Sequence, residues 1–288
     1  MKNTLIASSI ALMTIGTNAA FADIAISGDA RMGVVHTESS ANVDNETQFD
    51  SRVRFTVAGT GSTDAGLSFG AAMRIDQSGQ GGTANNDSTV YVGNDAFTVT
   101  FGDVDSAIKT AVGDVAGVGY TGIGSNNEVG YLGVDNTAVS IAVGAGPVGV
   151  YVSAGQRQAN SDNNTMGVGA QFAVAGVSLA AGYAEDGAVS QTALGVGVDV
   201  AGIGISAVYL DNDAHATVDA EYAASASYSI NGVTLTGFYR EVENLVTANN
   251  TYTGIGASYD LGGGATLAGG IVDQDGTNRM DLGLKLAF

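Results

Sequence analysis

The segment Ser51-Arg52-Val53-Arg54-Phe55-Thr56-Val57 alternates strictly between apolar and polar side chains. In an extended chain, Val53, Phe55 and Val57 fall on one face, and the two arginines fall on the opposite face. Strict alternation over a whole segment predicts a β-strand with one apolar and one polar face.

The same period of two continues through most of the chain. In 24–34 the even positions are apolar or Gly, and 67–75 places Arg74 on its polar face. Further strands are predicted near 88–93, 96–102, 137–144, 147–154, 164–172, 177–184, 190–199, 203–210, 218–229, 233–241, 250–259, 265–273 and 280–288. The sequence therefore predicts an all-β protein of about 16 strands, with no helical stretch and weak alternation in the middle strands.

The connections between these strands alternate in length. Short, Gly-marked connections are expected at Thr60–Gly66, Gly93–Ala96, Gly144–Pro147, Val174–Gly176, Val200–Gly202, Ile230–Gly232 and Asp260–Gly264. Mostly longer and more polar ones are expected at His36–Phe49, Asp76–Asp87, Gly102–Asn136, Gly155–Asn163, Ala184–Val189, Asp211–Thr217, Val242–Asn249 and Gln274–Arg279. Short turns at one end and longer loops at the other are typical of a transmembrane antiparallel β-barrel.

The last segment, Met280-Asp281-Leu282-Gly283-Leu284-Lys285-Leu286-Ala287-Phe288, is apolar at every even position. Asp281 and Lys285 fall on its other face, and the chain ends on an aromatic residue. Pairing of this strand with the first would remove both sheet edges, as a bilayer demands.

Trp is absent, so an interfacial belt would consist of Tyr and Phe. Such side chains fall near the long-loop ends at Tyr183, Tyr209 and Tyr239, and near the short-turn ends at Phe172, Tyr228, Tyr259 and Phe288. Two girdles of this kind are typical of membrane barrels, and ordinary core aromatic residues are the alternative.

Residues 1–22 have the pattern of a secretory signal peptide. Lys2 precedes the apolar segment Leu5–Ile15, and Ala20-Phe21-Ala22 fits a small-residue cleavage site. The alternative is a short buried N-terminal helix. We expect removal of 1–22 and a single barrel domain over 23–288.

The composition excludes some partners. The expected mature chain has 29 acidic and 9 basic residues, a net charge of −20 with His neutral. This argues against nucleic acid, whose phosphates require clusters of Lys and Arg. Cysteine is absent, so an exported chain must be stable without disulfides.

One connection, Gly102–Asn136, is much longer than the others. It is rich in Gly, Val and Asp and shows no strand-like alternation. A connection of this length within a compact domain is usually functional or disordered. We expect it to fold into the mouth of the barrel and narrow it.

The chain resembles the general porins of alphaproteobacterial outer membranes. The matching segments are 26–34, 51–56, 64–71, Val118-Gly119-Tyr120-Thr121, 254–265 and the terminal Phe288. The resemblance implies sixteen antiparallel strands, a homotrimer with one pore per subunit, and a third loop folded inward as a constriction. It also implies contact with outer-membrane lipid and passage of ions and small hydrophilic solutes.

The charge pattern suggests which residues line the constriction. If the apolar faces meet lipid, Arg31, Arg52, Arg54 and Arg74 point side by side into the lumen. The long connection contributes Asp103, Asp105, Asp114 and Glu128 on the opposite side. A basic wall facing acidic groups would set a strong transverse field. The alternative is that the arginines anchor the loop through salt bridges.

The sequence indicates no enzyme. His36 and His215 each stand alone in predicted loops, without a partnered nucleophile. No cofactor is expected; structural Ca²⁺ is an open alternative because the Asp-rich loops offer oxygen ligands, but no residues can be assigned. The leading hypothesis is a passive diffusion channel. The alternatives are a secreted or surface-attached all-β adhesin and an outer-membrane enzyme on the same barrel.

Overall fold

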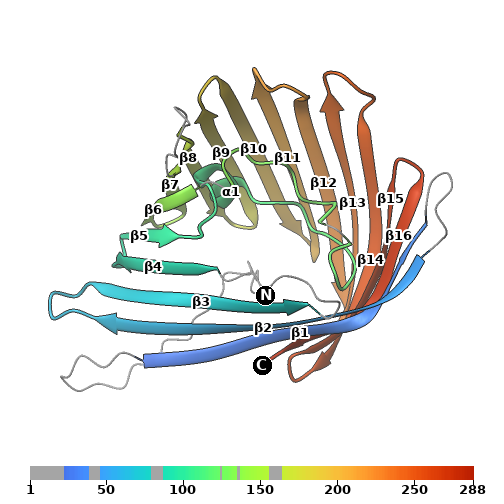
Figure 1. Cartoon of the computed structure of the whole chain (residues 1–288), viewed down its shortest axis with the longest axis horizontal. Coiled ribbons are helices and arrows are strands. Elements are labelled where there is room, and N and C mark those ends of the chain that lie inside the picture. The colour runs from blue at the N-terminus through green and yellow to red at the C-terminus, as the bar shows by residue number, and fades with distance from the viewer. Residues whose placement is uncertain (1–22, 39–45, 79–86, 124, 135–136, 156–163) are drawn as a thin grey trace.

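The computed structural model describes residues 23–38, 46–78, 87–123, 125–134, 137–155 and 164–288. The predicted signal peptide, 1–22, lies outside these residues. The described strands form a closed antiparallel barrel in which every strand pairs with its neighbours in sequence and the first pairs with the last (Figure 1). The predicted fold class is confirmed.

The strands are β1 (Asp23–Thr37), β2 (Glu46–Ser62), β3 (Ser68–Ser78), β4 (Ser88–Gly93), β5 (Phe97–Gly102), β6 (Thr137–Ala145), β7 (Val148–Gly155), β8 (Met166–Val174), β9 (Val177–Asp186), β10 (Val189–Val200), β11 (Ile203–Asp213), β12 (Val218–Ile230), β13 (Val233–Asn244), β14 (Asn250–Gly262), β15 (Ala265–Gln274) and β16 (Thr277–Ala287). Each predicted strand is present. The strands β1 and β2 run further than predicted, because their paired polar ends carry no apolar alternation that a sequence pattern could detect.

Three local predictions are wrong. A helix, α1 (Ala107–Val112), lies within the long connection, where no helix was predicted. Six residues are too few for a periodic signal, and so short a helix depends on tertiary packing for its stability. The connections expected at Ala184–Val189 and Gln274–Arg279 are not long, because only two residues separate the strands at each. Gly187 and Gly276 take positive φ there, which permits tight hairpin turns.

The two faces of the sheet differ as the alternation predicted. Large apolar side chains cover the outside: Phe55 is 42% exposed, Leu194 51% and Ile205 54%. Between them along the strands, polar and small residues point into the interior. So many exposed apolar side chains are stable in contact with lipid acyl chains, where they need not be buried inside the protein. Among the described residues, no helix is long and apolar enough to cross a membrane.

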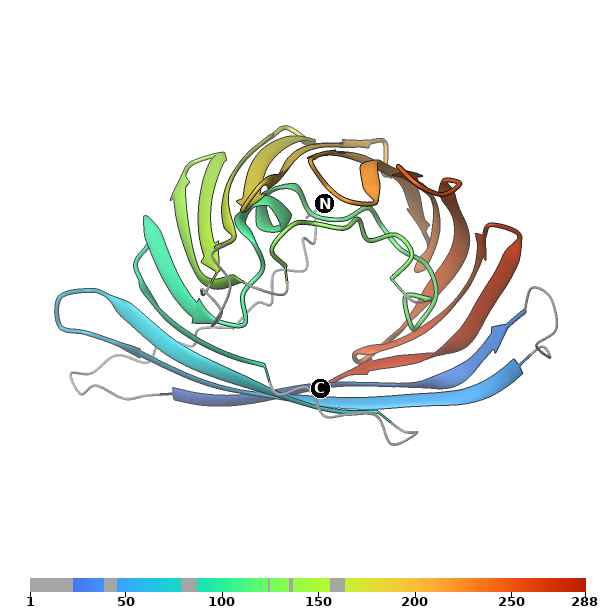
Figure 2. The ribbon, with the colours of Figure 1, turned by 45° about the horizontal axis from the view of Figure 1, so that its top comes forward.

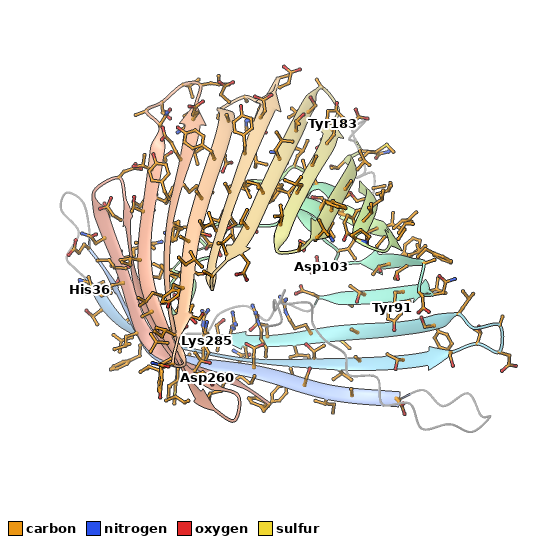
Figure 3. The ribbon with its side chains drawn as sticks, turned by 180° about the vertical axis from the view of Figure 1, so that it is seen from behind. His36, Tyr91, Asp103, Tyr183, Asp260 and Lys285 are labelled. Atoms are coloured by element: carbon orange, nitrogen blue, oxygen red, sulfur yellow. The ribbon has the colours of Figure 1, made fainter. Side chains whose placement is uncertain are left out.

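The aromatic residues predicted as two girdles lie on the outer face. All seven are exposed: Phe172, Tyr183, Tyr209, Tyr228, Tyr239, Tyr259 and Phe288. Tyr183 and Asp260, at the ends of their strands, mark opposite rims of the barrel in Figure 3. The outward position favours the girdle interpretation over core aromatic residues.

The seam between β1 and β16 closes the sheet. Its register runs from Asp29 opposite Ala287 to Thr37 opposite Arg279. Beyond this ladder, Phe288 N donates to Gly28 O at 3.0 Å, and Gly28 N donates to Phe288 O at 2.7 Å. The terminal ring also meets Phe55 edge-on, at 5.8 Å between centroids. Closure leaves no sheet edge, and an unpaired edge cannot be tolerated in hydrocarbon.

We expect Leu194→Arg to destabilise the folded barrel by about 2–4 kcal/mol, because the outward side chain lies near the middle of β10, where a charge would enter hydrocarbon. The measurement is the urea dependence of folding into lipid vesicles, read as heat-modifiable migration on a detergent gel. Leu194→Met is the control and should fold as the wild type does. Equal stability of the arginine variant would place this face away from lipid.

Candidate functional site

The connection between β5 and β6 lies inside the barrel (Figure 2). From β5 the chain enters α1, which contacts β7, β8, β9 and β10. It then crosses the inner wall to a tip at Val118–Thr121, whose residues meet β14, β15, β16 and β1. We call residues 103–134 the inner segment. Its inward position is the one the sequence predicted.

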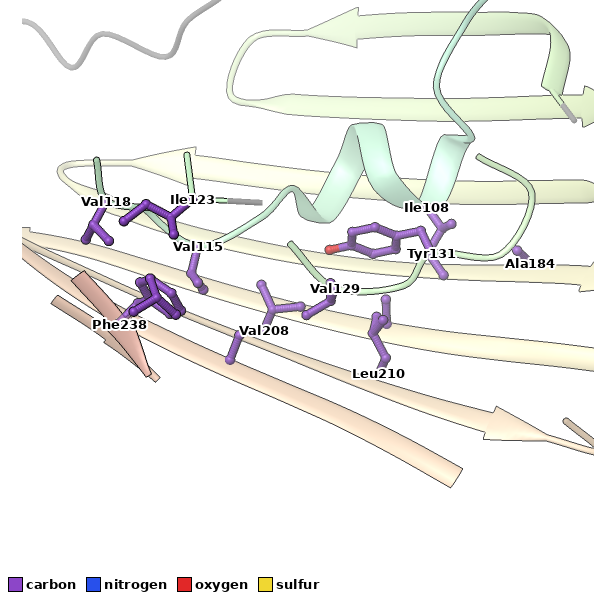
Figure 4. Close-up of a cluster of buried hydrophobic side chains, with 13 residues drawn as sticks. Ile108, Val115, Val118, Ile123, Val129, Tyr131, Ala184, Val208, Leu210 and Phe238 are labelled. Carbon is purple, nitrogen blue, oxygen red and sulfur yellow. The ribbon is translucent and has the colours of Figure 1, made fainter. Parts of the chain in front are cut away.

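Apolar packing holds the inner segment against the wall (Figure 4). Ile108 of α1 is fully buried, and so are Leu210 and Val272 of the wall. One cluster joins both sides: Ile108, Val115, Val118, Ile123, Val129 and Tyr131 from the segment, with Ala184, Ala193, Val208, Leu210, Ala223, Phe238 and Val272 from the strands. This half of the inner wall is therefore a core, which explains why the middle strands alternate so weakly in sequence.

Polar side chains of the wall bind the backbone of the inner segment. Gln191 of β10 accepts from Leu132 N at 2.9 Å and donates to Gly130 O at 2.8 Å. Glu221 of β12 accepts from Gly130 N at 3.2 Å and is held by Arg240 at 2.7 Å. These buried groups satisfy amides and carbonyls that the irregular backbone would otherwise leave unpaired.

The tip is held by Asp281 of β16. Its two carboxylate oxygens accept from Tyr120 N at 3.1 Å, Thr121 N at 2.7 Å and Thr121 Oγ1 at 2.5 Å. Asp281 is 6% exposed, so these contacts are shielded from water. Hydrogen bonds to a charged acceptor are the stronger kind. Asp281 is therefore a main attachment of the tip to the wall.

The four predicted arginines lie on the inner face of β1, β2 and β3. Each has an aspartate partner on the same side of the barrel: Arg31 Nε lies 2.9 Å from Asp50, Arg52 Nη2 lies 3.1 Å from Asp29, Arg54 Nε lies 2.7 Å from Asp76, and Arg74 pairs with Asp87. We call these eight residues the ion-pair ladder. The wall was predicted to be basic, but four carboxylates offset its four guanidiniums.

The predicted acids lie on the inner segment but differ in setting. Asp103 and Glu128 are exposed, and Asp105 lies 3.4 Å from Lys109 Nζ. Asp114 instead accepts from Val129 N at 3.0 Å, inside the segment. Although the residue as a whole is exposed, partial loss of water around its carboxylate and the nearby Asp87 carboxylate raise the pKa of Asp103, and Arg74 opposes this. Burial also raises the pKa of Asp114.

The alternative in which the arginines anchor the segment through salt bridges is wrong for the described residues. None of the four pairs with an acid of the inner segment there. Among the described residues, the arginines make one hydrogen bond to the inner segment, from Arg31 Nη1 to Thr121 O at 3.4 Å. Sequence reasoning missed the anchors Gln191, Glu221 and Asp281. Each is a polar residue on the face of its strand opposite the outward apolar side chains, which is the signal that could have found them.

The two histidines take part in local contacts. His36 Nδ1 lies 2.7 Å from Thr47 Oγ1, and His215 Nδ1 accepts from Val218 N at 3.0 Å. Within the described ranges, no group of three or more His, Cys, Asp or Glu side chains could hold a metal ion. Structural Ca²⁺ stays a prediction without assigned residues.

A closed barrel with an apolar exterior, a charged interior and an inserted segment is the architecture of a channel-forming membrane protein. Residues 7–279 match the model of the Gram-negative porin family. A porin of Rhodobacter capsulatus is 30% identical over 308 residues, covering 92% of this chain and 100% of the relative. A porin of Fuscovulum blasticum is 24% identical, with coverage of 92% and 100%.

Solved structures agree in fold. A mutant of Rh. blastica porin superposes with a TM-score of 0.77 at 21% identity, covering 92% of this chain and 100% of that one. The chain belongs to the Gram-negative porin family. It forms a channel in the outer membrane, and these findings favour the channel over the secreted adhesin.

We expect Asp281→Ala to loosen the tip. Two backbone amides, of Tyr120 and Thr121, would lose their acceptor, which costs about 1–3 kcal/mol for a buried donor. Hydrogen exchange at these amides in detergent should accelerate by about tenfold or more. Asp273→Ala is the control, because Asp273 accepts from Gly276 N in the β15–β16 turn. Unchanged exchange at both tip amides would show that Asp281 does not hold the tip.

Proposed function

We propose that the inner segment, within the predicted stretch Gly102–Asn136, narrows the channel for ions and small hydrophilic solutes. Asp105 and Glu128 face the ion-pair ladder across the constriction, and Asp103 lies beside its Arg74–Asp87 pair. The observation that carries this is the packing of a whole connection onto the inner wall, with Asp103, Asp105 and Glu128 left exposed. Charged groups lining a narrow passage are the usual determinants of selectivity.

The charge balance favours cations. The ion-pair ladder is nearly neutral, whereas the described inner segment carries four carboxylates and one lysine. The net field at the constriction therefore comes from the segment, and it attracts cations. Salt should weaken the preference, because screening shortens the reach of exposed charges.

A homotrimer with one channel per subunit is proposed from the family resemblance, and the apolar outer face is proposed to contact outer-membrane lipid where subunits do not meet. The protein is also proposed to have no enzymatic activity. It belongs to a family of porins, the contact of His36 with the Thr47 hydroxyl is exposed, and His215 accepts from a backbone amide. Recording in a planar bilayer tests the assembly: conductance steps should come in groups of three, and only single steps would contradict the trimer.

Asp103→Asn with Asp105→Asn should lower the preference for cations over anions. The measurement is the reversal potential across a bilayer with a salt gradient at low ionic strength. Wild-type preference should also fall as the pH drops through the raised pKa of Asp103, since protonation removes its charge. Asp260→Asn, at the short-turn rim, is the control and should change little. Anion preference of the wild type would contradict the proposal.

Arg54→Ala should raise the single-channel conductance. The substitution removes a large side chain from the lumen and releases Asp76, which Arg54 neutralises at 2.7 Å. The first effect widens the passage, and the second leaves a carboxylate that attracts cations. Arg54→Lys keeps the charge and most of the length, so its conductance should stay near that of the wild type. No change on removal of Arg54 would place this residue away from the constriction.

A further inference from the structure

Glycines line the wall where the inner segment docks. Under α1 and under the tip, the register of neighbouring strands places Gly directly opposite Gly, at Gly169–Gly182, Gly256–Gly270 and Gly33–Gly283. Together with Gly195 of β10, we call these seven residues the glycine bed. Gly weakens the interior of a strand, so repeated Gly at opposed positions indicates that other backbone approaches the sheet closely there.

The inner segment supplies the atom nearest to an added Cβ at Gly169, Gly182, Gly195 and Gly270. At Gly33 and Gly283 the neighbouring strand supplies it, with Tyr120 of the segment close behind. A Cβ built on Gly182 would lie 2.7 Å from Ile108 Cγ1 and 3.0 Å from Ile108 Cα. One on Gly270 would lie 2.8 Å from Gly119 N and 3.0 Å from Val118 Cβ. At both positions, the three nearest atoms all belong to the inner segment. A single methyl group therefore cannot fit unless the segment moves away from the wall.

Glycines elsewhere on the inner face lack this property. Gly144 of β6 lies on the lumen side beyond the docked segment, and a Cβ there would meet nothing within 4 Å. Other inner-face glycines are crowded by the wall itself, as with Tyr91 at Gly70 and Ser178 at Gly197. Contact with the inner segment is therefore what distinguishes the docking path. The buried anchors Gln191 and Glu221 act on the same segment, so polar contacts hold it while the bed sets how deeply it sits.

We propose that the glycine bed sets the free width of the channel by fixing the depth at which the inner segment docks. The glycines are positioning residues: they need no contact with solute, and they act by letting the segment lie flush with the sheet. This inference rests on the proposed role of the segment as the constriction. A methyl group at Gly182 or Gly270 would lift the segment into the lumen and narrow the passage.

The test compares Gly182→Ala, Gly270→Ala and the control Gly144→Ala in liposomes, using swelling rates with neutral sugars of increasing size. The two bed variants should admit large sugars more slowly, with little change for small ones, and single-channel conductance should fall by tens of per cent. Gly144→Ala should behave as the wild type. Neutral sugars isolate width from charge.

A second substitution gives the decisive readout. Ile108→Ala removes Cγ1, the atom nearest to the Cβ of Gly182→Ala, and leaves Cα and Cβ in place. The double variant should therefore regain part of the wild-type size dependence. An equal slowing for all sugars would mean fewer working channels and would overturn the inference, as would an unchanged size dependence in folded Gly182→Ala and Gly270→Ala. If the bed variants behave as wild type while Asp103→Asn with Asp105→Asn alters selectivity, the inference fails and the constriction stands.

Discussion

Hydrocarbon offers no hydrogen-bond partner to a backbone amide, and the whole molecule follows from that constraint. A sheet in this environment must close, so β1 has to meet β16 across a chain of 288 residues. Closure creates an interior, and the interior receives the charged side chains that lipid would reject. The tip of the inner segment lies at this seam, where Asp281 of β16 and Arg31 of β1 both bind Thr121.

The interior has two unlike halves. Over β9–β15 the inner segment covers the wall and converts it into a core, in which Leu210 and Val272 are fully buried. Over β1–β3 the wall carries the ion-pair ladder instead. A strand in the first half therefore carries apolar or small residues on both faces, apart from polar anchors such as Gln191 and Glu221. A strand in the second half is apolar only toward lipid. We propose that this asymmetry leaves the passage between the ion-pair ladder and the inner segment.

The sequence predictions succeed to different degrees in these two halves of the interior. Where one face is polar, as in 51–57, the period of two identified the strand at once. Where the segment covers the inner face, the alternation is weak. Gly-marked turns such as Asn231-Gly232, whose residues both take positive φ, separate the strands there. The helix α1 was missed because its stability comes from packing on the wall, which no local pattern of six residues records.

The sequence by itself determined the strands, the outward direction of their apolar faces and the inward direction of the arginines, because side-chain alternation is a local property of extended chain. Tertiary structure alone decided the partners. Arg31 meets Asp50 across 19 residues, and Thr121 meets Asp281 across 160. Such pairs depend on strand register and on the docking depth of the inner segment, and both are set only when the barrel closes and its interior fills.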